Sequence, residues 1–251
     1  MYTYQDLKKI QKPVLPFAGR LFDPIAEPLV LFLANYTRIT PTMLNWGNII
    51  ISLASAYYFY SGEVILGAIL FAIAFLCDCM DGNLARMKFK ANRFGMFMEV
   101  NGDKIRVMLP LLGLTHTYYL ATNDISIFYW AFAFISTNLF FPFAEAYMGY
   151  QSGKKGYEKS YVVTDANAGA QFTTGKLARM RNFLRKRRFD IIYTGLDQEV
   201  AAILIFPLLS YFSFELIKWG FIFAAFSYTL WVLIIRYPRQ IKNILEEDRK
   251  N

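Results

Sequence analysis

The stretch that decides the fold reads DCMDGNLARMKFKANRFGMFMEVNGD and runs from Asp78 to Asp103. It lies where two otherwise apolar segments meet. Asp78 and Asp81 are three residues apart, so on a helix they share one face. Gly95, Glu99 and Asp103 are spaced by four and line the next helix in the same way. Ordinary surface carboxylates are disfavoured here, because acids inside a membrane are costly unless they have a function. Two acidic faces on adjacent antiparallel helices can close around hard divalent cations, which prefer several oxygen ligands.

The composition is that of a polytopic membrane protein. The chain has 251 residues, of which 55% are hydrophobic and 18% aromatic, and the apolar residues are bunched into long runs. A formal charge of +8 is compatible with nucleic-acid binding. However, the basic residues lie between the apolar runs, which is how membrane topology is encoded. We therefore expect no nucleic-acid partner.

Six apolar segments predict six transmembrane helices, near residues 43–60, 64–81, 94–120, 125–150, 199–214 and 215–235. Before them, a proline-punctuated arm leads to the apolar run 29–34. This run is too short to cross ~30 Å of hydrocarbon, so it predicts an N-terminal amphipathic helix lying in the interface. The expected fold is an all-α integral membrane protein, in which residues 1–251 form a single domain with a juxtamembrane arm over 1–42.

The distribution of basic residues predicts the topology. Among 27 Lys and Arg, Lys218 is the single one on the short-loop side of a six-helix arrangement. This asymmetry places both termini, the acidic stretch and the long basic loop 151–198 in the cytoplasm. Within that loop, residues 176–189 fit either an amphipathic helix on an anionic leaflet or a solvated run of charges. No targeting signal is recognised, which favours the plasma membrane of a prokaryote.

The acidic stretch resembles the signature of the CDP-alcohol phosphotransferases, also called CDP-alcohol phosphatidyltransferases. That signature reads D-x2-D-G-x2-A-R, then a spacer, then G-x3-D-x3-D. One fixed position departs from it, because the third Asp is Glu99 here. The positions that match are Asp78, Asp81, Gly82, Ala85, Arg86, Gly95 and Asp103.

The resemblance implies a site and a reaction. A phosphoalcohol group, here a phosphatidyl-type group, passes from a CDP-linked lipid or alcohol to an acceptor alcohol, and CMP is released. Two Mg²⁺ or Mn²⁺ ions are expected, and Asp103 is also the expected general base. The implied metal ligands are Asp78, Asp81, Glu99 and Asp103. The implied nucleotide contacts are Asp78, Gly82, Ala85, Arg86 and Gly95. Family members often form homodimers, so a homodimer in contact with membrane lipids is expected.

The acceptor is a small alcohol or a phosphorylated polyol, and its contacts are the least defined. Glu145, Arg185 and Arg188 are candidates, although Glu145 could simply reach water and the arginines could simply fix topology. Lys104 and Arg106 either reach phosphate or neutralise the acids, and the sequence favours neither.

Two other functions stay open from the sequence. One is a transferase that uses a soluble CDP-alcohol donor with a lipid or polyol-phosphate acceptor. The other is a non-catalytic membrane relative, marked by Glu99 in place of Asp. A working variant is favoured, because every other position of the signature is intact.

Overall fold

A computed structural model describes residues 1–10, 17–89, 93–151, 193–238 and 241. Throughout these ranges the regular structure is helical, without a strand. The N-terminal part contains α1 (Tyr4–Ile10), α2 (Phe17–Tyr36), α3 (Pro41–Tyr60), α4 (Val64–Lys88) and α5 (Arg93–Thr122). The C-terminal part contains α6 (Ser126–Gln151), α9 (Gly195–Glu199), the π-helical η1 (Val200–Ile205), α10 (Phe206–Leu209), α11 (Leu216–Trp231) and the π-helical η2 (Val232–Arg236).

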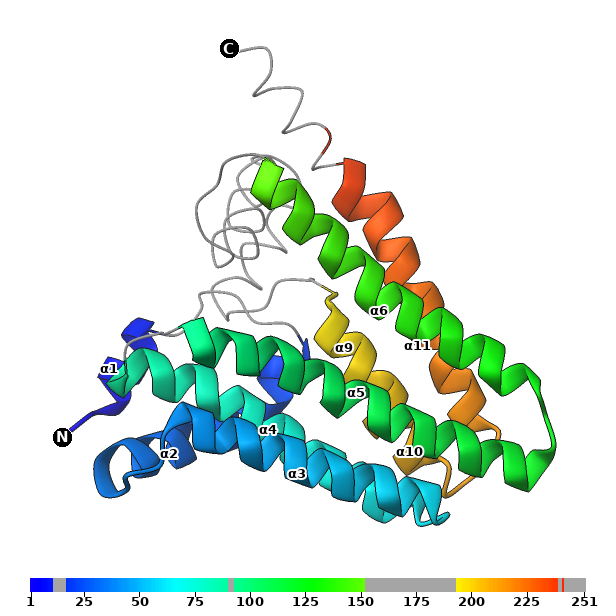
Figure 1. The fold of residues 1–251 in the computed structure, drawn as a ribbon, viewed down its shortest axis with the longest axis horizontal. Helices are drawn as coiled ribbons and strands as arrows, with labels where there is room; N and C mark the ends of the chain where they lie inside the picture. Colours follow the sequence, from blue (N-terminus) through cyan, green and yellow to red (C-terminus); the bar gives the residue numbers. More distant parts are fainter. Residues whose placement is uncertain (11–16, 90–92, 152–192, 239–240, 242–251) are drawn as a thin grey trace, which may run out of the picture.

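The helices form two groups (Figure 1). In the first, α3 packs along both α4 and α5 more extensively than those two helices pack on each other. In the second, α6 and α11 lie side by side and lean away from α5. The short elements α9 and α10 lie between the two groups, and η1 contacts both α4 and α5. The segment that follows the long loop therefore reaches the helices that carry the acidic signature.

Local sequence sets both ends of α3. Thr40 is its N-cap, and the Thr40 hydroxyl accepts a hydrogen bond from the Met43 amide at 3.3 Å. Pro41 occupies the first helical position, where no intrahelical amide is needed. At the other end Gly62 has φ +91°, a left-handed conformation that glycine adopts without steric cost. The turn at Gly62 sends α4 back along α3.

Close helix packing depends on small residues. A Cβ built on Gly113 of α5 would lie 2.5 Å from the backbone oxygen of Ala56 on α3. Such contacts let helix backbones approach closely in a membrane, where apolar burial between helices gains little. On the opposite side, α3 exposes an apolar face at helical spacing, formed by Trp46, Ile50, Leu53 and Tyr57. That face fits contact with lipid.

Three helices are long and apolar enough to cross a membrane within the described ranges: Val64–Lys88, Ser126–Ala144 and Leu216–Arg236. They coincide with the second, fourth and sixth segments expected from the sequence. The protein is thus an all-helical integral membrane protein. The count of six spans and the interfacial placement of the N-terminal helix stay predictions, although a helix is present at Phe17–Tyr36.

Two helices differ in their bounds from the predicted spans. The second helix continues beyond residue 81 to Lys88, so the acids lie inside it and not at its end. The fifth segment does not run from 199 to 214. It begins at Gly195, where Thr194 and Asp197 form a capping box, and it ends at Leu209. There the Ser210 hydroxyl donates to the Pro207 carbonyl and closes the helix.

Ion pairs fasten the end of the bundle that is remote from the acidic signature. Lys218 of α11 lies 2.6 Å from Asp124 in the α5–α6 connection and 3.3 Å from Glu215. Tyr118 of α5 donates to Glu215 at 2.7 Å. The hydrogen bond from Lys218 lowers the pKa of Asp124 to about 2. These contacts tie α5, α6 and α11 together at that end.

Two glycine substitutions test the packing of α3. Gly113→Ala drives a methyl group into the backbone of α3, and we expect a loss of about 1–3 kcal/mol in the free energy of unfolding. Gly47→Ala is the matched control, because a Cβ there meets nothing within 4 Å among the described residues, and alanine favours helix. Unfolding in detergent micelles measures both. Equal stability of the two variants would contradict the close α3–α5 contact.

Candidate active site

The two halves of the acidic signature lie on α4 and α5. Asp78 and Asp81 belong to α4, and Glu99 and Asp103 belong to α5. Asp81 is 3% exposed, whereas Asp78 and Asp103 are partly exposed and Glu99 is exposed. Asp78 and Asp103 lie beside the same guanidinium, so the two halves of the signature meet at these two carboxylates. The four signature carboxylates on α4 and α5 are called the acidic cluster below.

Arg106, one turn beyond Asp103 on α5, joins the two halves. Its side chain is fully buried. Nη1 lies 2.7 Å from Asp78 Oδ2, and Nη2 lies 3.5 Å from Asp103 Oδ1. The guanidinium also lies 4.8 Å from the centre of the Phe75 ring. Of the two roles that the sequence left open for Arg106, the structure shows charge neutralisation of the acids.

A second carboxylate group holds Arg106 from the other side. Glu199, at the end of α9, lies 3.1 Å from Arg106 Nη2 and is 5% exposed. Asn138 of α6 donates to Glu199 at 3.1 Å. Lys104 donates to Asn138 at 3.2 Å, so Lys104 turns toward α6 and not toward the acids. α4, α5, α6 and α9 thus share one buried polar network.

The third helix of the site is α3. Asn45 donates to Asp81 Oδ2 at 2.6 Å, and both side chains are buried. A Cβ on Gly102 of α5 would lie 3.0 Å from Asn45 Oδ1, so Gly102 leaves room for this amide. Asn48, one turn further along α3, is fully buried, and its amide nitrogen lacks a hydrogen-bond partner among the described residues.

The residues expected at the nucleotide lie on α4 and in the first turn of α5. Gly82 faces the guanidinium of Arg86, whose Nη1 lies 3.4 Å from a Cβ built on Gly82. Arg86 is exposed and donates to Asn83 at 2.9 Å. Ala85 and Gly95 are half-buried. Arg86 therefore presents its planar fork near the glycine of the signature, where a phosphate could be bound by two parallel hydrogen bonds.

The acceptor candidates cannot be placed. Arg185 and Arg188, together with the predicted helix over 176–189, lie outside the described residues. Glu145 lies within α6, but its side chain is also outside the described part.

The donor chemistry of the cluster fits a hard divalent cation. Carboxylate and amide oxygens are the ligands that Mg²⁺ prefers. The buried Oδ1 atoms of Asp103 and Asn45 accept no hydrogen bond from the part of the chain that is described. In the same part, no three His, Cys, Asp or Glu side chains come together as a closed group of metal ligands. Two of the four carboxylates are directed at Arg106 instead.

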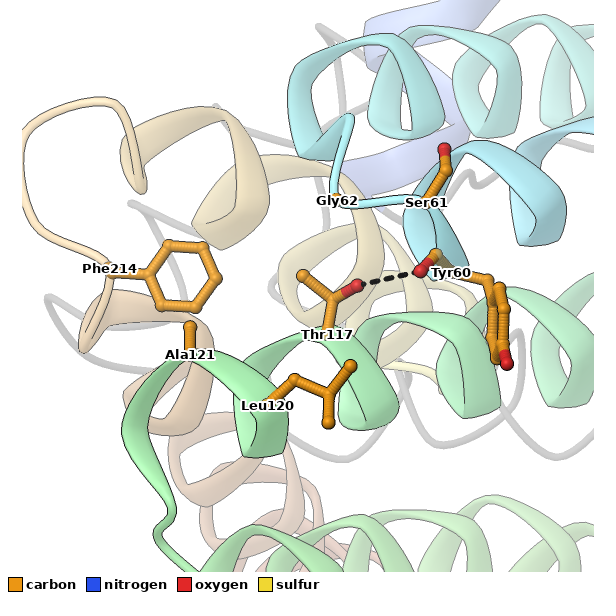
Figure 2. A pocket seen from close by; sticks show the side chains of 7 residues that line it. All are labelled: Tyr60, Ser61, Gly62, Thr117, Leu120, Ala121 and Phe214. Carbon is orange, nitrogen blue, oxygen red and sulfur yellow. Dashed lines mark hydrogen bonds between the residues drawn. The ribbon is translucent and has the colours of Figure 1, made fainter.

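A separate pocket lies at the opposite end of the bundle (Figure 2). It has a volume of about 390 Å³ and is lined by Tyr60, Ser61, Gly62, Thr117, Leu120, Ala121 and Phe214. The Thr117 hydroxyl within it is already bonded to the carbonyl oxygen of Tyr60 at 3.2 Å. The pocket lies beside the α3–α4 turn and the last turns of α5, and the acidic signature is not part of it.

The fold and the site define an α-helical membrane protein with an acidic cluster on two adjacent helices. Comparison with known sequences gives the class its name, because the pattern of the CDP-alcohol phosphatidyltransferase family matches residues 38–174. The chain belongs to this family. The match includes α3, α4 and α5, which carry the cluster.

Two archaeal proteins are similar to part of this chain. Archaetidylinositol phosphate synthase of Methanothermobacter thermautotrophicus is 34% identical over 100 residues, which are 40% of this chain and 47% of that protein. Archaetidylinositol phosphate synthase of Pyrococcus horikoshii is 34% identical over 76 residues, which are 30% of this chain and 40% of that protein. The chain thus matches less than half the length of these curated relatives.

Sequence reasoning missed three residues of the network, namely Asn45, Asn138 as a partner of Glu199, and Glu199 itself. All three are polar side chains within or at the end of predicted spans. Polar side chains in predicted spans indicate a polar network, because polar groups inside a membrane pair with one another. Spacing alone did not connect them, because their partners are far away in the sequence.

A pair of alanine variants tests the contribution of α3 to the site. Asn45→Ala removes the donor that Asp81 uses, and a buried carboxylate without its donor costs about 1–3 kcal/mol. Asn48→Ala is the matched control, because it removes the same amide one turn away without disturbing an acid. In chelator-treated protein, we expect Asn45→Ala to lower the midpoint of unfolding more than Asn48→Ala does. If the two variants were equally stable, the Asn45–Asp81 hydrogen bond would contribute nothing.

Proposed function

We propose that this protein transfers a phosphatidyl-type group from a CDP-linked lipid to a small alcohol or a phosphorylated polyol. CMP is the second product. Family membership supports the class of reaction. The observation that carries the proposal is the meeting of the two signature halves, because Asp78 of α4 and Asp103 of α5 share the guanidinium of Arg106. The donor lipid is CDP-diacylglycerol or an archaeal CDP-linked diether.

The roles of the side chains follow from their chemistry. Asp103 accepts the proton of the acceptor hydroxyl, a role that the family resemblance implies for the last carboxylate of the signature. The hydroxyl oxygen forms a bond to the phosphorus that bears the lipid, the bond from this phosphorus to the CMP oxygen breaks, and CMP leaves. Arg86 and the backbone at Gly82 bind the diphosphate. Two Mg²⁺ or Mn²⁺ ions, held by Asp78, Asp81, Glu99 and Asp103, would neutralise the diphosphate and the leaving oxygen.

Inositol phosphate is the first acceptor to examine. Both archaeal relatives carry the name archaetidylinositol phosphate synthase, and a phosphorylated polyol suits the basic loop 151–198. We propose Glu145, Arg185 and Arg188 as acceptor contacts. We also propose that the protein is a homodimer in a prokaryotic plasma membrane, with its site and both termini in the cytoplasm, because nearly all basic residues lie on that side of the predicted topology.

Release of CMP by the purified protein in lipid tests this function. The assay pairs CDP-diacylglycerol, a CDP-linked diether and soluble CDP-alcohols with inositol phosphate, glycerol phosphate, serine and polyols, in Mg²⁺ or Mn²⁺. We expect one lipid donor and one phosphorylated acceptor to give CMP. Asp103→Asn removes the base and a metal ligand, so we expect turnover to fall by at least about a hundredfold.

Two outcomes would contradict the proposal. Turnover that persists in Asp103→Asn would remove Asp103 as the base. Absence of CMP across the whole panel, from folded protein, would favour a non-catalytic membrane relative. Glu99→Asp then restores the usual signature, and activity gained by that variant would identify Glu99 as the cause.

A further inference from the structure

Arg106 and Glu199 form a pair that no part of the family signature contains. Resting on the divalent-metal requirement of the proposed function, we propose that Arg106 is a positioning residue that limits the affinity of the acidic cluster for divalent cations. Glu199 is the counter-charge of Arg106 and sets how strongly Arg106 competes with a divalent cation for the carboxylates of the cluster.

The competition follows from the contacts of Arg106. Its Nη1 atom holds Asp78 at 2.7 Å, and its Nη2 atom is shared between Glu199 at 3.1 Å and Asp103 at 3.5 Å. Asp78 and Asp103 are also two of the four proposed metal ligands. A cation that binds both must replace the guanidinium at these oxygens. Arg106 therefore opposes the cation in two ways. It occupies the carboxylate oxygens, and its positive charge repels the positive charge of the cation.

Glu199 is rigidly placed for its role. It receives hydrogen bonds from Asn138 and from Arg106, and it is 5% exposed. Its neighbour Gln198 donates to Thr137 of α6 at 2.7 Å. The next neighbour, Asp197, accepts from the amide of Ala18 at 2.6 Å, where a negative charge favours the N-terminus of α2. Glu199 therefore stays in place when Arg106 loses its contacts with the acids.

Glu199 offsets the positive charge of Arg106. Four carboxylates match two divalent cations, and Arg106 adds a positive charge that Glu199 cancels. When cations are bound, Arg106 keeps Glu199 as its partner. The positive charge of Arg106 offsets part of the negative charge of Asp78 and Asp103. The pair thus moderates metal binding.

Mn²⁺ titration of the full chain in detergent micelles, followed by electron paramagnetic resonance, tests this pair. Arg106→Gln removes the competitor, so the Mn²⁺ dissociation constant should fall by about tenfold. Glu199→Gln leaves Arg106 without its counter-charge, so the constant should rise by about tenfold. Arg106→Lys keeps the charge without the fork and should give an intermediate constant. These opposite directions separate a tuned charge from a general loss of packing.

A second readout covers the case in which a variant is unstable. In chelator, Arg106→Gln should unfold at a lower temperature than the wild type and regain more stability on addition of Mn²⁺. Lys218→Gln is the matched control, because it breaks an ion pair at the other end of the bundle. We expect its Mn²⁺ dissociation constant to equal that of the wild type.

The outcomes separate this inference from the proposed function. If the wild type binds Mn²⁺ and releases CMP but Arg106→Gln and Glu199→Gln shift the constant by less than twofold or in the same direction, the inference is wrong and the function stands. If the opposite shifts appear without CMP release, the cation site is as inferred and the transferase function is wrong. Wild-type protein that binds no Mn²⁺ overturns the inference.

Discussion

The arrangement of the site depends on one constraint: a guanidinium buried in an apolar bundle needs carboxylates around it. Arg106 obtains them from three elements, α4, α5 and α9. Breaking a buried ion pair by removing one partner is costly, because the remaining charge stays buried and uncompensated. Each of these elements is therefore held in register with the others at the acidic cluster. The Phe75 ring against the guanidinium excludes water from one side of the contact.

This constraint explains why the two ends of the bundle differ. Near Arg106, polar side chains from α3, α5, α6 and α9 replace the apolar contacts that usually join helices. At the opposite end, glycine and aromatic packing join the helices, with Gly113 against α3 and the Phe214 ring stacked on Tyr118 at 5.7 Å. The ion pairs of Lys218 lie at the edge of this packing, in the connections between helices. The buried polar network therefore lies at the end of the bundle that carries the acidic signature.

The sequence predicted what depends on local spacing. Asp78, Asp81 and Asp103 sit on two helix faces as their spacing of three and four required, and the helical membrane class followed from the apolar runs. Contacts between distant segments were not predictable in this way. Glu199 lies 93 residues from Arg106, and Asn45 lies 36 residues from Asp81. Helical spacing carries no information about such pairs, because they depend on how α3 and α9 pack.

The bounds predicted for the fifth segment differ from those of the helix for a related reason. Its hydropathy suggested one continuous span starting at residue 199, but Glu199 belongs to the polar network and the helix begins at Gly195 with a capping box. The π-helical turns of η1 follow directly and shift the register of the side chains behind them. Composition cannot reveal this shift, because the residues of η1 are as apolar as those of an ordinary span.

The departure at Glu99 has a structural reason. Asp81 is 3% exposed and bonded to Asn45, and Asp78 and Asp103 are bound by Arg106, so an added methylene at these positions would displace a tightly packed neighbour. Glu99 is the exposed member of the four, one turn before Asp103 on α5. A longer side chain has room there. The substitution thus occurs at the position of the cluster where the fold tolerates extra length.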